Sequence, residues 1–213
     1  DDAEVNLYTR FVKSESDNDQ FGGMFGDDPT YLTKQEEFSI RGEGKIKLFN
    51  GLWNQKIGLS FIRNVRKNSY DTSSASIYYS HSLYDGRKYK IDWQNDFQLS
   101  NSNLLTAGFE FEVEEAASEY YAYTFIRPPD YASIIPMRDA NTFGVFIQDQ
   151  LKLDESFFVT IGLRLDDQNK FGSQVTYRIA PAFMLWETGT KFKATIGTGF
   201  KAPSLFYLYD PAF

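Results

Sequence analysis

Apolar and polar side chains alternate along much of this sequence. In residues 156–167, apolar side chains occupy every second position from Phe157 to Leu165, and the positions between them carry Thr, Gly, Arg and Asp. An α-helix would spread both sets around its circumference, whereas successive side chains of a β-strand point to opposite faces. We therefore predict a strand with one apolar face and one hydrated face.

The same period of two recurs and predicts nine strands. Each of them exceeds the five or six residues that are usual in globular proteins. The apolar faces carry almost no charge, while the opposite faces carry many Asp, Glu, Lys and Arg side chains. The predicted strands span residues 3–13, 36–49, 53–65, 87–98, 104–114, 141–153, 156–167, 174–186 and 190–200.

The connections between these strands alternate in length. Short ones at 49–53, 99–103, 153–156 and 187–190 are rich in Asn, Asp, Gly and Ser, as tight turns are. Longer ones span 14–35, 67–86, 116–139 and, more modestly, 167–173. In a meander this order places all tight turns at one end and all longer loops at the other, an asymmetry typical of outer-membrane barrels.

The predicted fold class is therefore all-β: an antiparallel up-and-down meander of about nine strands that forms part of a larger transmembrane β-barrel. A soluble sandwich or propeller also alternates, but strand length and the separation of charge favour the barrel. A sheet of this size has two open edges, predicted near Glu4–Val12 and Lys191–Phe200. Open edges invite pairing, so isolated copies are expected to self-associate.

Composition narrows the function classes. The chain has 17% aromatic residues, no cysteine and a net charge of −7. The acidic balance argues against nucleic acid as a partner, and the missing cysteines exclude disulfides and thiolate metal sites. With His81 as the single histidine, a Ser-His-Asp triad or a zinc site is improbable, and we expect no enzymatic activity.

Three motifs point to a family. Residues 197–203 read Gly-x-Gly-aromatic-basic-Ala-Pro, residues 144–149 read Gly-x-aromatic-x-Gln-Asp, and residues 85–97 with 105–110 form a hairpin-like pair. Their order and spacing resemble the barrel of TonB-dependent outer-membrane receptors of the cobalamin and siderophore type, over roughly residues 36–213. The family barrel has about 22 strands around a plugged lumen. The resemblance therefore implies that residues 1–213 are an internal part of such a barrel domain, with the plug domain and the remaining strands absent.

The resemblance also implies a function. The parent protein would lie in the bacterial outer membrane, contact its lipid, bind a siderophore or cobalamin, and import it with energy supplied by the TonB complex through the plug. Two alternatives stay open from the residues themselves: a passive porin-like channel and a soluble β-sheet ligand-binding module.

Candidate ligand contacts lie in the predicted loop 116–139. Aromatic rings together with a guanidinium suit an anionic metal chelate or a corrinoid, although loop–loop packing is an alternative role. The candidate residues are Tyr120, Tyr121, Tyr123, Phe125, Arg127 and Tyr131.

No cofactor is required by this interpretation, but calcium is a candidate. Asp17, Asp19, Asp27 and Asp28 cluster in the first predicted loop, and clustered carboxylate oxygens can coordinate Ca²⁺. Their spacing does not match an EF-hand. Some receptors of the resembled cobalamin type order their loops with calcium.

Carboxylates also repeat on the hydrated strand faces, as in Glu110 with Glu112 and Asp92 with Asp96. We interpret them as part of a hydrated salt-bridge network against a plug rather than as a catalytic pair. The candidate basic partners are Arg41, Lys45, Lys47, Lys90, Arg164, Arg178, Lys191 and Lys193.

Overall fold

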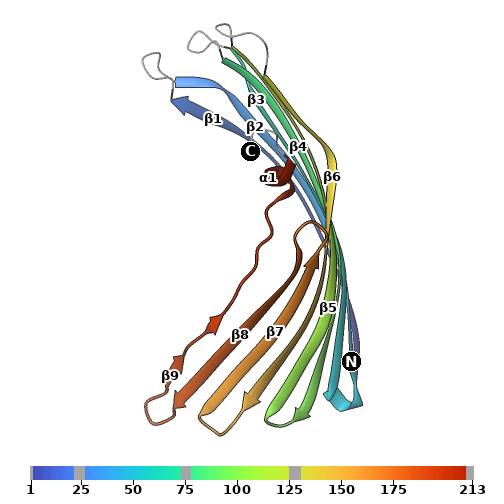
Figure 1. Cartoon of the computed structure of the whole chain (residues 1–213), viewed down its shortest axis with the longest axis vertical. Helices are drawn as coiled ribbons and strands as arrows, with labels where there is room; N and C mark the ends of the chain where they lie inside the picture. The colour runs from blue at the N-terminus through green and yellow to red at the C-terminus, as the bar shows by residue number, and fades with distance from the viewer. Residues whose placement is uncertain (1, 22–26, 73–77, 125–130, 210–213) are drawn as a thin grey trace.

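The computed structural model describes the backbone of residues 2–21, 27–72, 78–124 and 131–209, and the side chains of these except 19–21, 27–29, 78 and 124. The strands form one antiparallel sheet in the order β1-β2-β3-β4-β5-β6-β7-β8-β10, with β9 also paired to β8 (Figure 1). The elements are β1 (Ala3–Phe21), β2 (Asp27–Leu48), β3 (Trp53–Tyr70), β4 (Tyr78–Ser100), β5 (Asn103–Thr124), β6 (Tyr131–Lys152), β7 (Phe157–Gln168), β8 (Gly172–Leu185), β9 (Thr190–Lys193), β10 (Ile196–Gly197) and the helix α1 (Leu205–Tyr209).

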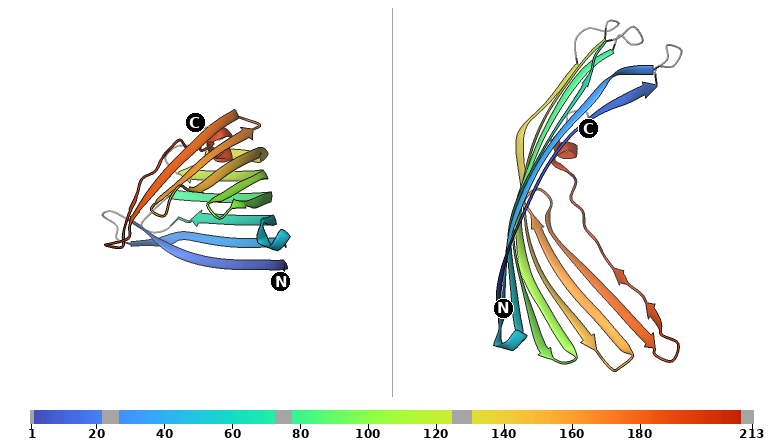
Figure 2. Two further views of the ribbon diagram at one scale, coloured as in Figure 1. Left: turned by 90° about the horizontal axis from the view of Figure 1, so that it is seen from below. Right: turned by 180° about the vertical axis from the view of Figure 1, so that it is seen from behind.

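The predicted all-β antiparallel meander is thus confirmed. The sheet is curved, and α1 lies on its concave side (Figures 1 and 2). Each strand from β1 to β8 pairs with its sequence neighbours, and the four predicted tight turns gather at one end of the sheet. The connection between β7 and β8, at the other end, is also short, at residues 169–171. No helix within the described residues is long and apolar enough to cross a membrane.

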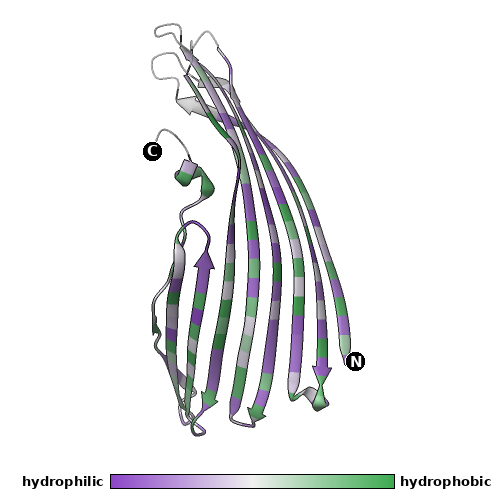
Figure 3. Ribbon diagram, turned by 45° about the vertical axis from the view of Figure 1, so that its right-hand side comes forward, coloured by the Kyte–Doolittle hydropathy of each residue, from purple (hydrophilic) through white to green (hydrophobic). Residues whose placement is uncertain are grey.

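Figure 3 shows hydrophobic and hydrophilic residues alternating along the strands. Because successive side chains of a strand point to opposite faces, the two faces of the sheet differ in chemistry. The register places Ile91, Phe109, Val145 and Leu163 on one face, which we call the outer face. It places Lys90, Glu110 and Arg164 on the other, the inner face, which is also the concave side where α1 lies.

The outer face is exposed rather than packed. Leu59, Ile161 and Leu163 keep 59%, 43% and 53% of their surface, and the buried apolar residues of the described chain are just Ile135, Ala140 and Leu205. On β7 the outward apolar row from Phe157 to Leu165 measures about 26 Å along the strand. With the tilt of about 35–45° that is usual for strands of membrane barrels, this row would span a height of about 19–22 Å, close to the apolar belt of about 25 Å in such barrels. We call it the apolar band.

The strands are longer than predicted. Most of the predicted loops 14–35, 67–86 and 116–139 belongs to strands β1–β6. The β4–β5 ladder, for example, runs from the pair Ser100–Asn103 to the pair Tyr78–Thr124. Beyond the apolar band both faces meet water, so hydropathy no longer alternates, but backbone pairing does not depend on that alternation. The period of two therefore located the apolar part of each strand and missed its more polar extension.

Two details of strand pairing also differ from expectation. In β6, Pro136 and Met137 together oppose Ala117, since Ala116 pairs with Arg138 and Ser118 with Ile135. Such a bulge accommodates a proline, which lacks the N–H for the ladder, and it reverses which β6 side chains face inward. The predicted strand 190–200 is broken into the short β9 and β10.

The face assignment predicts how charge is tolerated on β7. Ile161→Arg puts a guanidinium at the middle of the apolar band and should lower the free energy of unfolding in lipid vesicles by about 2–4 kcal/mol. Thr160→Arg, on the inner face of the same strand, should have little effect. Urea titration of the complete protein measures both, and a larger loss for Thr160→Arg would contradict the assignment.

Candidate functional site: the charged inner wall

The inner face carries an ion-pair network that crosses several strands. Lys90 Nζ on β4 lies 2.6 Å from Glu110 Oε2 on β5. The guanidinium of Arg164 on β7 also pairs with Glu110, and it lies 2.5 Å from Asp166 Oδ1. Glu110 therefore links β4 to β7 through two cations.

A second cluster lies toward β1. Arg41 on β2 binds both carboxylate oxygens of Asp92 on β4, at 2.8 and 3.0 Å, and Nη2 also lies 3.3 Å from Glu43. Lys45 then bridges Glu43 at 3.3 Å and Glu4 of β1 at 3.5 Å. The two clusters together reach from β1 to β7.

Two glycines allow these pairs to cross an intervening strand. Gly58 of β3 pairs in register with Glu43 and Asp92, and a Cβ placed there would lie 2.7 Å from Asp92 Oδ2. Gly144 of β6 pairs with Glu110 and Asp166, and its Cβ would lie 2.7 Å from Asp166 Oδ1. Without side chains at these two positions, Arg41 and Arg164 reach over the strand to a carboxylate two strands away.

The carboxylates singled out in the sequence are thus mostly paired within the wall itself. Lys88 adds contacts to Glu112 at 2.9 Å and Glu114 at 2.5 Å. Asp96, by contrast, accepts hydrogen bonds from Thr106 at 2.7 Å and from Gln94. Of the predicted basic partners, Arg41, Lys45, Lys90 and Arg164 form ion pairs. None is found for Lys47, Arg178, Lys191 or Lys193 in the described part of the chain.

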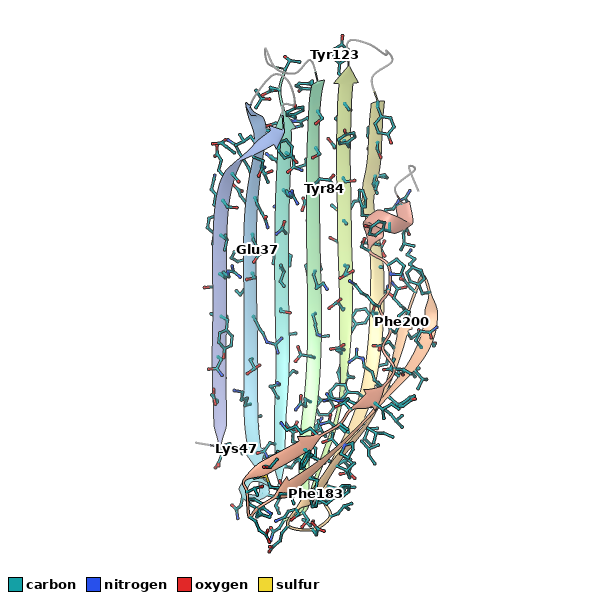
Figure 4. All side chains as sticks on the ribbon, turned by 90° about the vertical axis from the view of Figure 1, so that its left-hand side faces the viewer. Glu37, Lys47, Tyr84, Tyr123, Phe183 and Phe200 are labelled. Atoms are coloured by element: carbon teal, nitrogen blue, oxygen red, sulfur yellow. The ribbon has the colours of Figure 1, made fainter. Side chains whose placement is uncertain are left out.

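Aromatic side chains gather farther along the inner face. Tyr120 and Tyr131 meet edge to face with ring centroids 5.9 Å apart, and Tyr84 meets Phe206 of α1 at 6.2 Å. The guanidinium of Arg138 lies 5.1 Å from the ring centroid of Tyr209. Figure 4 looks onto this concave side and shows Tyr84 on β4.

The predicted ligand contacts divide between the two faces. Tyr120 and Tyr131 lie together on the inner face, because the bulge in β6 turns Tyr131 inward. Tyr121 and Tyr123 alternate with Tyr120 on β5 and therefore project from the outer face, 40% and 37% exposed. Phe125 and Arg127 lie outside the described residues, and the assignment of all six to ligand binding stays a prediction.

The calcium prediction also stays untested. Asp17 is an exposed residue of β1, while the side chains of Asp19, Asp27 and Asp28 lie outside those described. No group of three or more His, Cys, Asp or Glu that could hold a metal ion occurs among the residues that the structure places.

Beyond the apolar band the outer face becomes charged, a feature that the sequence analysis missed. Arg63 donates two hydrogen bonds to Asp85, at 2.8 and 3.2 Å, and Arg87 adds a third at 3.2 Å. The guanidinium of Arg63 holds the pKa of the Asp85 carboxyl below its usual range. This ionic row marks the edge of the apolar band on β3 and β4.

Comparison with known proteins decides the family. Residues 2–213 match the family described as TonB dependent receptor-like, beta-barrel. This chain belongs to the TonB-dependent receptor β-barrel family.

A curated relative of this receptor chain is the vitamin B12 transporter BtuB of Vibrio cholerae serotype O1. It is 38% identical over 149 residues, which cover 70% of this chain and 22% of BtuB. The chain thus matches about a fifth of the length of its curated relatives. The family consists of outer-membrane receptors and transporters rather than of an enzyme class.

Solved structures share the fold. The ferric citrate transporter FecA superposes with a TM-score of 0.68 at 10% identity, over 92% of this chain and 33% of FecA. The ferric-catecholate import receptor Fiu of E. coli K12 gives 0.67 at 11% identity, over 92% of this chain and 38% of Fiu. The open sheet thus corresponds to part of a TonB-dependent receptor barrel.

The role of Gly58 can be tested against a glycine with free space around it. Gly58→Ala should displace the Arg41–Asp92 pair and lower the free energy of unfolding by about 1–3 kcal/mol. Gly42→Ala is the control, because a Cβ at Gly42 meets no atom within 4 Å. Urea titration of the receptor in lipid measures the free energy of unfolding of both variants. An equal loss in Gly58→Ala and Gly42→Ala would contradict the steric role of Gly58.

The Arg164 network predicts a second difference. Arg164→Met leaves Glu110 and Asp166 without their shared cation, and these groups are only partly exposed, so the loss should be about 1–3 kcal/mol. Arg178 lies on the same inner face, on the neighbouring strand β8, and Arg178→Met should leave the free energy of unfolding nearly unchanged. The two unfolding titrations are compared at equal ionic strength, and a neutral Arg164→Met would show that the network adds no stability.

Proposed function

We propose that the receptor containing this chain imports a metal chelate or cobalamin across the bacterial outer membrane, with energy supplied through TonB. This chain contributes part of the barrel wall: its apolar band faces lipid and its inner wall faces the lumen. The observation that carries the proposal is the family match over residues 2–213, joined to a sheet with an exposed apolar outer face and a charged inner one.

The chemistry of the inner wall supports gated transport rather than catalysis. Arg41, Lys90 and Arg164 each pair with carboxylates of the wall itself. A wall whose charges are largely paired internally binds the contents of the lumen weakly, so that a plug or a ligand can move along it without breaking strong ion pairs. The mechanism is ligand binding followed by a conformational change, with no covalent step.

The ligand class follows from the relatives. Cobalamin is favoured by the curated relative that is 38% identical and named as a vitamin B12 transporter. A ferric chelate is the second candidate, on the strength of the same family. In both cases we assign the first contacts to the inward-facing aromatics, foremost Tyr120 and Tyr131.

Uptake by cells tests the proposal. The complete receptor, produced in cells that lack their own cobalamin and ferric-chelate receptors, should accumulate labelled cyanocobalamin or ferric citrate only when TonB is present. Uptake that continues without TonB would indicate a passive channel instead. Accumulation of neither probe, in cells where the receptor is present in the outer membrane, would count against the proposed ligand classes.

The two faces of the sheet at β5 and β6 give a matched set of variants. Tyr120→Ala and Tyr131→Ala remove inward rings and should weaken binding of the transported probe about tenfold, as loss of a well-placed aromatic contact does. Tyr121→Ala and Tyr123→Ala remove outward rings and should leave binding unchanged. Equilibrium binding to outer-membrane vesicles measures all four, and the opposite ranking would move the contact surface to the outer face.

A further inference from the structure

Two large apolar side chains are buried among the described residues, and they lie together on the inner face. Leu205 of α1 is 5% exposed and Ile135 of β6 is 4% exposed, which makes them two of the three buried apolar residues. Ser118 of β5, beside them, is 7% exposed. The hydrated wall thus includes a small hydrophobic seat at this point, and Leu205 of α1 occupies it.

Small residues shape this seat. Gly86, Ala116, Ser118 and Ile135 line a cavity of about 100 Å³ together with Leu205 and Phe206. The small residues Gly86, Ala116 and Ser118 on β4 and β5 let Leu205 approach the sheet, while Tyr84 of β4 borders the same cavity. Two aromatic contacts flank the seat, from Tyr84 to Phe206 and from Arg138 to Tyr209.

Within the described residues, few contacts hold the segment that leads to α1. We call residues 198–209 the C-terminal strap. Thr198 still bonds to Tyr177 of β8, with its N–H 3.0 Å from the carbonyl oxygen. From 199 to 203 no backbone hydrogen bond to the sheet occurs within the described chain, and four of these five residues are exposed. The strap therefore runs along the concave side and is anchored at its two ends (Figures 1 and 4).

A second hollow lies directly beside the seat. It measures about 320 Å³ and is lined by Ile62, Asn64, Lys88 and Glu114 of the wall and by Ser204 and Phe206 of the strap. This volume is within the range of small-molecule sites. The strap forms one side of this hollow, so its position sets how open the hollow is.

We propose that the C-terminal strap is a movable gate on the inner wall. In the closed state, Leu205 sits in the seat and Phe206 narrows the hollow beside Lys88. In the open state, α1 leaves the seat as a unit and the strap swings away on its unpaired residues 199–203. A short helix held by one buried side chain belongs to the part of a structure that opens locally at low cost. The link between this motion and transport rests on the proposed function, whereas the motion itself does not.

Thiol labelling tests the motion without any ligand. Residues 1–213 contain no cysteine, and any cysteine elsewhere in the complete receptor is first replaced by serine. In the complete receptor, Ser118→Cys places a thiol in the seat under α1. A water-soluble maleimide should label it slowly, and Leu205→Asp should accelerate labelling more than about tenfold because the buried apolar anchor is lost.

Ser82→Cys is the matched control. Ser82 is also inward-facing and 4% exposed, but it does not line the seat. Its labelling rate should not change with Leu205→Asp. If the Ser118→Cys receptor is labelled at the same rate with and without Leu205→Asp, the proposal is overturned, since α1 would then not control access to the seat.

A crosslink tests the link to transport. Arg138→Cys with Tyr209→Cys replaces the cation–π pair by two thiols, which a short bifunctional reagent can join and so lock the strap. Locking should reduce uptake of cyanocobalamin or ferric citrate more than about tenfold, and each single-cysteine variant treated with the reagent should transport normally. Undiminished uptake by the locked receptor would overturn the gate. If the untreated receptor accumulates neither probe, the proposed ligand classes fail, and the labelling of the Ser118→Cys receptor still decides whether the strap moves.

Discussion

Continuous backbone pairing in a sheet whose two faces meet different surroundings is the constraint on which this structure depends. Each strand from β2 to β8 is paired on both sides, which satisfies the backbone without any apolar core. Because the backbone is satisfied by strand pairing, the side chains of the two faces can differ: apolar rows lie on the outer face and charged groups on the inner face. This explains how a chain with so few buried apolar residues can hold one regular architecture, and why its strands continue past the apolar band.

The inner wall shows how strand register turns scattered charges into a network. Arg41 and Asp92 lie on strands that are not adjacent, and so do Glu110 and Arg164. They meet because Gly58 and Gly144 leave space on the strand between them. These two glycines therefore allow the ion pairs of the wall to form, although they carry no charge themselves.

A single bulge decides which aromatic groups face the lumen. The two-for-one pairing at Pro136 and Met137 turns Tyr131, Ser133 and Ile135 inward. It thereby creates both the Tyr120–Tyr131 contact and the apolar seat for α1. The candidate ligand surface and the proposed gate thus share one origin, which is a local change of register caused by a residue that cannot donate a backbone hydrogen bond.

The sequence by itself determined the fold class, the meander order, the tight turns and the division into apolar and charged faces, because these follow from local alternation and turn chemistry. Three motifs also pointed to the correct family. Tertiary structure alone decided how far β1–β6 extend, where the predicted strand 190–200 breaks, which tyrosines face inward, and which cation meets which carboxylate. Each of these depends on register and on contacts between distant residues, such as Leu205 with Ile135, and hydropathy along one strand carries no information about the partner across the ladder.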